Sequence, residues 1–471
     1  MVFSSGIFLF LFLPTFLAVY YLTPFRWKSF VILTGSYLFY AWWRVDFLSL
    51  FVAVTAWNYV VGLLIYRAGL ATIHAKRWVT LGVIGNLLTL GYFKYANFGI
   101  DSFDALVTSM GFEPLAAGRI ILPIGISFYI FQAISYIVDV YRGDTAPTRR
   151  FIDFAAFIAL FPQLIAGPVL RYQDLADQFS MRTHTVDKFT EGAQRFMQGF
   201  IKKVFIADSI APLADAAFAL ENPSAGDAWL GALAYTAQLY FDFSGYSDMA
   251  IGLGLMMGFR FIENFNQPYI SQSITEFWRR WHISLSTWLR VYLYIPLGGN
   301  RHGTFHTYKN LFLTMLLGGL WHGANWTFVC WGAWHGLILG VERYLGIGKP
   351  GSGFKFTNWG ITMFLVIIGW VMFRATDVGE AVKMYMAMFG SMDYSLHAEY
   401  RSGISLMQIY ILALSYVIIL YFGLRDFFNH KVVLVINKVS PVVQPLVLPI
   451  FIISIFKLAS QSYSPFLYFQ F

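Results

Sequence analysis

Cysteine and charged residues are both scarce in this 471-residue chain. The only cysteine is Cys330, so an internal disulfide and a cluster built from several thiolates are both excluded. Charged residues make up 12% of the chain and hydrophobic residues 58%, whereas a soluble domain carries roughly 25% charge. One water-soluble core would hardly bury so much apolar surface, because such cores stop growing near ~250–300 residues. We therefore expect a protein embedded in lipid.

Several sequence signatures of common enzymes are also missing. The chain has no GxSxG elbow, Walker A loop, HExxH or CxxC motif, and no histidine is followed five residues later by aspartate, as in soluble HxxxxD acyltransferases. We expect no metal site. Gly252, Gly254 and Gly258 do not match the GxGxxG spacing, which excludes a dinucleotide site of that type. Gly254 and Gly258 instead have the GxxxG spacing that permits close helix packing.

Long apolar stretches run along the whole sequence. Each spanning helix needs about 20 mostly apolar residues, and candidates fall near 4–22, 29–43, 47–66, 78–96, 120–140, 151–170, 195–220, 228–258, 310–345, 358–375, 403–423 and 443–459. Some are long enough for two passes or a broken helix. We predict an all-α, polytopic membrane bundle with about 11 spans plus re-entrant or interfacial helices, as a single domain over 1–471. The apolar N-terminus is expected to be a retained span and not a removed signal peptide.

Basic loops alternate with neutral or acidic ones. Arg26 and Lys28 follow the first apolar stretch, whereas Asp101, Asp104 and Glu113 dominate the segment before the fifth. Because cytoplasmic loops carry an excess of lysine and arginine, we predict the N-terminus outside and the first loop in the cytoplasm. The net charge of +8 is then a property of cytoplasmic loops, and we expect the lipid bilayer as a partner and no nucleic acid.

Two carboxylates interrupt the apolar run 228–258. Asp242 and Asp248 would each cost about 2.5–3.5 kcal/mol at mid-membrane, so they need a reason to be there. They could pair with lysine or arginine on neighbouring helices and fix the bundle. Alternatively, they could line a reaction chamber or serve a proton-coupled carrier.

The segment 273–290 is rich in arginine and tryptophan. Ser273 and Glu276 have capping-box spacing, so we predict that a helix begins there. Arg279, Arg280 and Arg290 then alternate with Trp278, Trp281 and Trp288. This composition is typical of an interfacial helix, and it would equally suit a mouth for a phosphate-bearing donor, because guanidinium groups bind paired oxygens.

Two histidines lie within the apolar stretch 310–345, each in a Trp-His-Gly triplet. His335 is best interpreted as a core histidine, whereas Asn325 and the glycines near His322 predict a helix break. On one continuous helix the two rings would not share a face, which argues against a metal site between them. The other histidines lie near polar segments and are predicted to be solvated: His74, His184, His302, His306, His397 and His430.

Six stretches resemble the membrane-bound O-acyltransferase family, and within it the alginate-acetylating branch. They are LPIGISFYIFQAISYIVDVYR (122–142), FPQLIAGPVLR (161–171), QLYFDFSGYSDMAIGLG (238–254), ITEFWRRWHISLSTWLR (274–290), YLYIPLGGNR (292–301) and GGLWHGANWTFVCWGAWHG (318–336). The likeness runs from the opening MVFSS to the terminal PFLYFQF. It implies a helical bundle around a central funnel or tunnel in the bacterial inner membrane.

The resemblance also implies site residues. The family's invariant histidine matches His322, and its second signature position, which is Asn, Asp or His across the wider family, matches His282. His322 would be the general base that activates a hydroxyl, and His282 would orient a substrate or share the proton. Donor binding is assigned to Arg279, Arg280, Trp278 and Asn325. Related sequences read RDYLYIPLGG, whereas Val291 follows Arg290 here.

Acetyl-CoA is the expected donor, with no bound cofactor, and periplasmic polysaccharide acetyltransferases or accessory proteins are the expected partners. The acceptor implied by the resemblance is alginate, and bacterial cellulose acetylated by the same mechanism is an alternative. Two other classes of function stay open: a carrier of the acetyl donor without chemistry of its own, and a scaffold for periplasmic enzymes.

Overall fold

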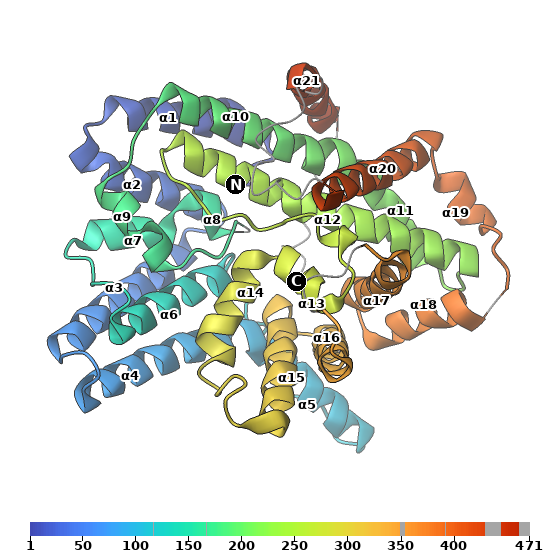
Figure 1. Cartoon of the computed structure of the whole chain (residues 1–471), viewed down its shortest axis with the longest axis horizontal. Helices are drawn as coiled ribbons and strands as arrows, with labels where there is room; N and C mark the ends of the chain where they lie inside the picture. Colours follow the sequence, from blue (N-terminus) through green and yellow to red (C-terminus); the bar gives the residue numbers. More distant parts are fainter. Residues whose placement is uncertain (116, 166, 349–353, 391, 429–443, 461–471) are drawn as a thin grey trace. The chain divides into compact units, whose positions relative to one another are not determined.

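The computed structural model describes residues 1–115, 117–165, 167–348, 354–390, 392–428 and 444–460. Within these ranges all regular structure is helical, which confirms the predicted all-α class (Figure 1). The chain divides into two compact units, residues 1–193 with 250–262 and residues 194–249 with 263–471, and each is described by itself. The division falls within two helices, α10 (Val186–Phe200) and α12 (Ala225–Met256).

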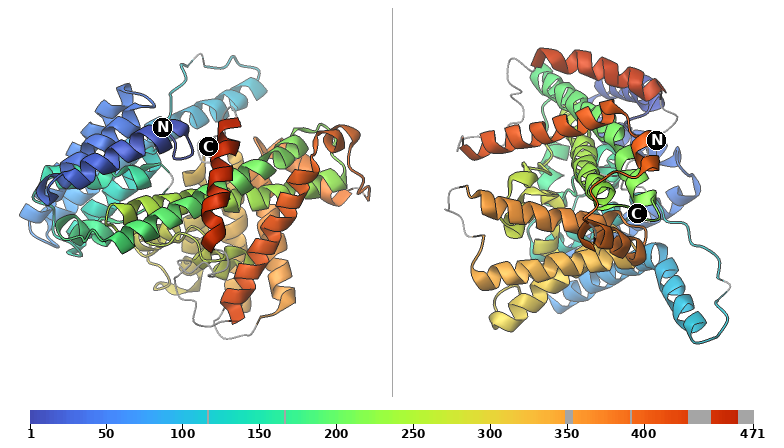
Figure 2. Two further views of the ribbon diagram at one scale, coloured as in Figure 1. Left: turned by 90° about the horizontal axis from the view of Figure 1, so that it is seen from above. Right: turned by 90° about the vertical axis from the view of Figure 1, so that its right-hand side faces the viewer.

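The first unit is built around three mutually packed helices, α3, α4 and α6, which lie side by side in Figures 1 and 2. A pair of buried amides joins two of them, since the side chains of Asn58 and Asn86 exchange hydrogen bonds of 2.9 and 2.7 Å. The elements of this unit are η1 (Phe8–Phe12), α1 (Leu13–Leu22), η2 (Phe25–Trp27), α2 (Lys28–Ala41), α3 (Asp46–Arg67), α4 (Ile73–Leu90), η3 (Gly91–Tyr95), α5 (Ala96–Ser109), α6 (Ile126–Arg142), α7 (Phe151–Ala159), α8 (Phe161–Leu164) and α9 (Tyr172–Ser180).

The second unit holds most of the residues predicted to be functional. Its elements are η4 (Ile201–Ala207), α11 (Asp208–Ala219), η5 (Pro268–Ile270), α13 (Ile274–Arg280), α14 (Ile283–Leu289), η6 (Arg290–Tyr294), α15 (Gly303–His322), α16 (Trp326–Leu345), α17 (Phe356–Arg374), α18 (Val378–Gly390), α19 (Ala398–Gly403), α20 (Leu406–Phe428) and α21 (Gln444–Ser460). The predicted stretch 310–345 is a broken helix: α15 ends at His322 and α16 begins at Trp326. The first residue of the predicted span 443–459 lies outside the described residues.

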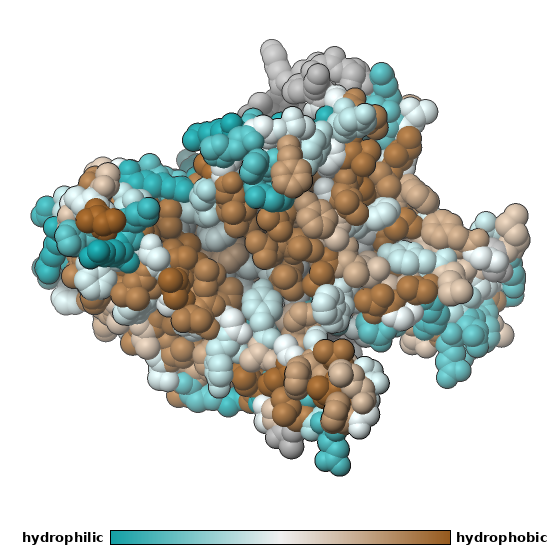
Figure 3. Space-filling model, turned by 90° about the horizontal axis from the view of Figure 1, so that it is seen from below, coloured by the Kyte–Doolittle hydropathy of each residue, from teal (hydrophilic) through white to brown (hydrophobic). Residues whose placement is uncertain are grey.

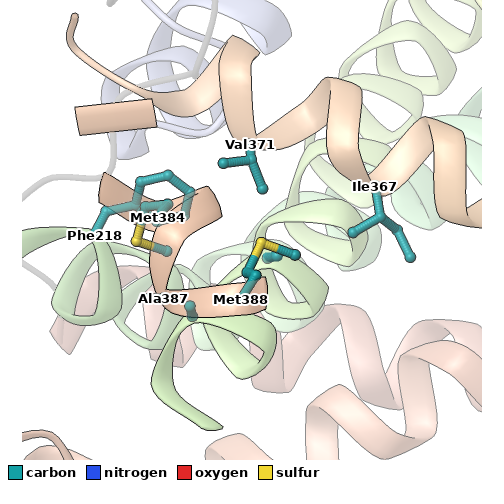
Figure 4. Packing of buried hydrophobic residues seen from close by; sticks show 8 residues of the cluster. Phe218, Ile367, Val371, Met384, Ala387 and Met388 are labelled. Carbon is teal, nitrogen blue, oxygen red and sulfur yellow. The ribbon is translucent and has the colours of Figure 1, made fainter. Parts of the chain in front are cut away.

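A buried hydrophobic cluster fixes one end of this unit. Small side chains of α12 face larger ones from α11, α17 and α18, so the helices approach closely (Figure 4). The members are Phe218, Ala228, Ala232, Ile367, Val371, Met384, Ala387 and Met388.

Close contact between α10 and α12 uses a different glycine pair from the one predicted. Gly258 has a φ of +85° and ends α12, because the Phe259 N–H donates to the carbonyl of Gly254 (2.8 Å). The GxxxG prediction is therefore wrong for Gly258. Instead, a Cβ on Gly199 would lie 2.4 Å from the carbonyl oxygen of Gly245, so these two backbones touch.

Hydrophobic side chains cover much of the molecular surface. Figure 3 shows apolar residues, drawn in brown, spread over one face, which is the surface expected of a protein whose solvent is lipid. Within the described ranges three helices are long and apolar enough to cross a membrane: α3, α17 and the 406–425 part of α20. The count of about 11 spans stays a prediction, because many apolar stretches are divided by breaks or by π-helical turns such as η3 and η4.

Candidate active site

Helix α13 begins where the sequence predicts and brings the first candidate residues into place. The Ser273 hydroxyl accepts a hydrogen bond from the Glu276 N–H (3.0 Å), which confirms the predicted N-terminus. The Glu342 carboxylate of α16 accepts hydrogen bonds from the N–H groups of Ile274 (2.5 Å) and Thr275 (2.8 Å). A carboxylate at the positive end of a helix is stabilising, so this contact ties α13 to α16.

His282 lies between α13 and α14 in an unusual backbone conformation. Its φ and ψ are 44° and 54°, in the left-handed region that few residues other than glycine adopt, and its side chain is fully buried. The turn separates two short helices and directs the imidazole inward. There it meets the ring of Phe243 from α12 edge to face, with the centroids 4.7 Å apart.

Asn264 determines the tautomer of His282. The backbone N–H of Ser284, which can only donate, points at Oδ1 of Asn264 (3.3 Å), while Nδ2 of Asn264 donates to the Ser247 hydroxyl (3.0 Å). The amide oxygen therefore faces Nδ1 of His282 at 3.1 Å. Because an amide oxygen only accepts, Nδ1 carries the hydrogen and Nε2 carries the lone pair. That Nε2 atom is buried and has no hydrogen-bond partner among the described residues.

His322 is the last residue of α15. Glycines bring α15 and α16 into contact as a hairpin, since a Cβ on Gly319 would lie 2.3 Å from the carbonyl oxygen of Phe328. The imidazole is 4% exposed and packs against Trp331 and Phe373, with ring centroids at 5.2 and 5.3 Å. The predicted helix break after His322 is confirmed.

The structure brings His282 and His322 together. Their ring centroids are 6.2 Å apart, and both imidazoles are buried. Trp321 packs against both rings, at centroid distances of 6.0 Å from His282 and 5.2 Å from His322. Two imidazoles shielded from bulk water, one with a lone pair fixed by Asn264, form an arrangement that can accept and share a proton.

His335 lies on α16, outside this pair of histidines. The indole N–H of Trp278 donates to its Nδ1 (3.3 Å), and its ring packs against Trp331 at a centroid distance of 4.9 Å. These contacts fit the predicted role of a core histidine. They also give Trp278 a structural partner.

The other residues assigned to donor binding have defined local positions. Arg279 is exposed, whereas Arg280 is half-buried and pairs with Glu276 (2.9 Å). The side chain of Asn325 caps α16 through the Thr327 N–H (3.1 Å) and donates to the carbonyl of Thr376 (2.8 Å). Donor binding by these residues stays a prediction.

Asp248 lies in a buried ion network of the second unit. It contacts Arg195 of α10 (2.7 Å) and Lys202 of η4 (2.7 Å), and Arg195 also pairs with Glu263 (2.6 Å). Asp242 is held in a second network, because Lys203 contacts its carboxylate at 2.7 Å and that of Asp208 at 2.6 Å. The interpretation that both aspartates pair with basic residues of neighbouring helices is confirmed.

Two residues escaped the sequence interpretation: Asn264, and His184, which was predicted to be solvated. Asn264 lies in a linker without a motif, and no signal in the sequence pointed to it. Of the histidines predicted to be solvated, His74, His302, His306 and His397 are exposed. His184 is half-buried and contacts the Tyr20 hydroxyl (2.9 Å), and His430 lies outside the described residues.

Comparison with known proteins identifies the family. The sequence model of the membrane-bound O-acyltransferase family matches residues 146–379, which include His282 and His322. The probable alginate O-acetylases of Pseudomonas putida and Azotobacter vinelandii are 61% and 59% identical to this chain, over 100% of each chain. A peptidoglycan O-acetyltransferase of Helicobacter pylori is 38% identical over 84% of this chain and 81% of its own length. The chain therefore belongs to the membrane-bound O-acyltransferase family.

Proposed function

We propose that this O-acyltransferase acetylates alginate, taking acetyl groups from a cytosolic donor, with His322 as the general base. The observation that carries the proposal is the pair of buried imidazoles with centroids 6.2 Å apart. The names of the relatives at 56–61% identity over the whole chain support alginate as the acceptor.

The proposed reaction is transfer from acetyl-CoA, the proposed donor, to a hydroxyl. His322 takes the hydroxyl proton as the oxygen attacks the thioester carbonyl, the C–S bond breaks, and the proton passes from the imidazole to the leaving thiolate. A positioned base contributes about 10²–10⁴-fold to such a step. The lone pair on Nε2 of His282 can receive a hydrogen bond from the hydroxyl or share the proton. Exposed Arg279 is proposed to contact the phosphates of the donor.

The proposal places the chain in the bacterial inner membrane as a multi-pass protein with a funnel or tunnel between the two faces. Such a passage would let a cytosolic donor meet an acceptor on the periplasmic side. Periplasmic acetyltransferases or accessory proteins would complete the modification of the polymer.

A carrier without chemistry of its own is the less favoured alternative. Its main support in the sequence was the intramembrane carboxylates. Asp242 and Asp248 both lie in buried ion pairs, with Lys203 and with Arg195 and Lys202. Carboxylates held in this way fit a structural role better than a carrier that must load and release protons.

The test is the degree of acetylation of alginate in cells that express single variants at normal protein level. We expect His322→Ala to abolish acetylation and His335→Gln, a buried histidine outside the pair, to retain most of it. Retained acetylation in His322→Ala together with loss in Asp242→Asn would favour the carrier. Retained acetylation in all variants would favour a scaffold, and acetylated cellulose or peptidoglycan with unmodified alginate would change the acceptor.

A further inference from the structure

Three basic side chains of the first unit contact Tyr20, and two of them meet at its hydroxyl. Nε of Arg182 donates to this oxygen (3.0 Å), and Nε2 of His184 lies 2.9 Å from it. The Tyr20 hydroxyl in turn donates to the carbonyl of Met257 (2.7 Å). The ammonium of Lys28 contacts the Tyr20 carbonyl and lies 4.1 Å from the centre of the Tyr20 ring. One tyrosine thus gathers a lysine, an arginine and a histidine.

Among the described residues, no acidic side chain forms an ion pair with this basic cluster. Lys28 and Arg182 are only 6% and 9% exposed, yet the ion pairs of the described residues in this unit join other side chains. Burial of a charge without a counter-ion is costly. In addition, Nη2 of Arg182 is buried and has no hydrogen-bond partner within the described part of the chain. A charged donor group is therefore left over.

Backbone carbonyls at the ends of two helices accept hydrogen bonds from Arg182 and Lys28. Nη1 of Arg182 donates to the carbonyls of Gln178 (3.2 Å) and Phe179 (3.3 Å) at the end of α9, and Lys28 contacts a carbonyl near the end of α1. Such carbonyls carry a partial negative charge only. His184 lies in the loop between α9 and α10. Its pKa is lowered to about 4, first by burial and then by the positive charges of Lys28 and Arg182.

The exposed aromatic side chains next to the cluster are of the kind found at a membrane–water boundary. Tyr21, Phe25 and Trp27 are 42%, 42% and 49% exposed, and exposed tyrosine and tryptophan are typical of the interfacial belt. Phosphate groups are the abundant anions of that layer. Arginine matches their paired oxygens, and lysine supplies a compact charge.

We propose that Arg182, Lys28 and His184 bind the phosphate group of an anionic ligand at the membrane interface. The phosphate would accept a hydrogen bond from Nη2 of Arg182 and supply the missing negative charge. It could belong to an anionic phospholipid or to a soluble phosphate compound. The inference does not rest on the proposed function, because none of these residues belongs to the candidate active site.

The experiment uses the full chain, purified in detergent and stripped of lipid. The thermal unfolding midpoint is followed while phosphatidylglycerol, inorganic phosphate or coenzyme A is added at constant ionic strength, with phosphatidylethanolamine and chloride as references. We expect a rise of a few degrees with a phosphate-bearing anion. Arg182→Gln and Lys28→Gln should each raise the half-saturating concentration at least about tenfold. Arg26→Gln, which removes an exposed charge two residues from Lys28, should respond like the unmodified chain.

The different additives distinguish a lipid from a soluble phosphate ligand, and the variants distinguish phosphate binding from a purely structural role of Arg182. A response to phosphatidylglycerol alone identifies a lipid headgroup. A response to inorganic phosphate or coenzyme A identifies a soluble ligand of this cluster only where Arg182→Gln or Lys28→Gln weakens it, because coenzyme A is also expected at the candidate active site. If Arg182 only caps helix ends, Arg182→Gln lowers the midpoint equally with and without the anion, and the rise persists. That result, or an unmodified chain that responds no more to these anions than to the references, overturns the proposal. Should Arg182→Gln fail to fold, Lys28→Gln decides alone.

Discussion

The backbone and side chain of His282 are held in place by Asn264, a residue that belongs to none of the sequence motifs. A left-handed backbone at a residue with a Cβ costs roughly 1–2 kcal/mol, so other contacts must maintain it. Asn264 supplies them, because its backbone carbonyl accepts the N–H of Ile283 (3.0 Å) while its side chain contacts His282 and Ser284. The tautomer of the imidazole therefore depends on one amide.

We expect Asn264→Leu to reduce acetylation by about 10–100-fold, because a buried donor left without an acceptor costs about 1–3 kcal/mol. The variant keeps the size of the side chain but cannot hold Nδ1–H of His282, so Nε2 loses its fixed lone pair. The measurement is the initial rate of acetyl transfer by purified protein. Asn264→Asp keeps an acceptor oxygen and should retain more activity than the leucine variant. Equal rates for the unmodified chain and Asn264→Leu would rule out control of the tautomer by Asn264.

Among the secondary structure elements, α10 and α12 meet at a backbone contact that leaves no room for a Cβ. The backbones meet at Gly199 and Gly245, and the Arg195–Asp248 pair lies on the same two helices. A helix separation that made room for one methyl group would also stretch a buried ion pair. Packing and charge pairing are therefore coupled in this part of the second unit.

We expect Gly199→Ala to lower the unfolding midpoint, since overpacking at a backbone contact costs about 1–3 kcal/mol. Its matched control is Gly360→Ala on α17, where a Cβ would meet nothing within 4 Å. The control should be neutral or slightly stabilising, because alanine favours a helix over glycine. The measurement is thermal unfolding of both variants in the same detergent. A similar midpoint for the two variants would contradict a tight α10–α12 contact.

Local signals in the sequence predicted several features correctly. Ser273 with Glu276 marks a helix start, and the glycines and Asn325 after His322 mark a break, because capping and helix breaking depend on near neighbours. The ion pairs of Asp242 and Asp248 followed from the cost of charge in lipid. Gly258 was misjudged because spacing alone does not tell a helix interior from a helix end. Asn264 and the basic cluster at Tyr20 depend on contacts between distant segments, which no local pattern predicts.

For the whole molecule, the decisive property is the apolar surface. Side chains that would be buried in a soluble protein are exposed here, such as Leu88 at 68% and Phe456 at 72%. We expect lipid to cover them and the charged loops to decide which end of the chain faces the cytoplasm. Orientation is thus a property of the entire sequence and not of one site.

The predicted orientation can be read by cysteine labelling in spheroplasts. After Cys330→Ala, single cysteines are introduced as Arg26→Cys in the first loop or Phe112→Cys in the segment before the fifth apolar stretch. Both positions are exposed. We expect a membrane-impermeant maleimide to label Phe112→Cys in intact spheroplasts and Arg26→Cys only after permeabilisation. The reverse labelling would place the N-terminus in the cytoplasm.

The left-handed backbone at His282 also restricts how this position can change by mutation. Glycine, asparagine, aspartate and, less readily, histidine tolerate that conformation. The codons for histidine, asparagine and aspartate differ only in their first nucleotide. A single base change can therefore exchange one hydrogen-bonding side chain for another without adding to the cost of the backbone conformation, and these three residues are the ones that the family resemblance implies at this position. Most other substitutions would have to remodel the turn between α13 and α14.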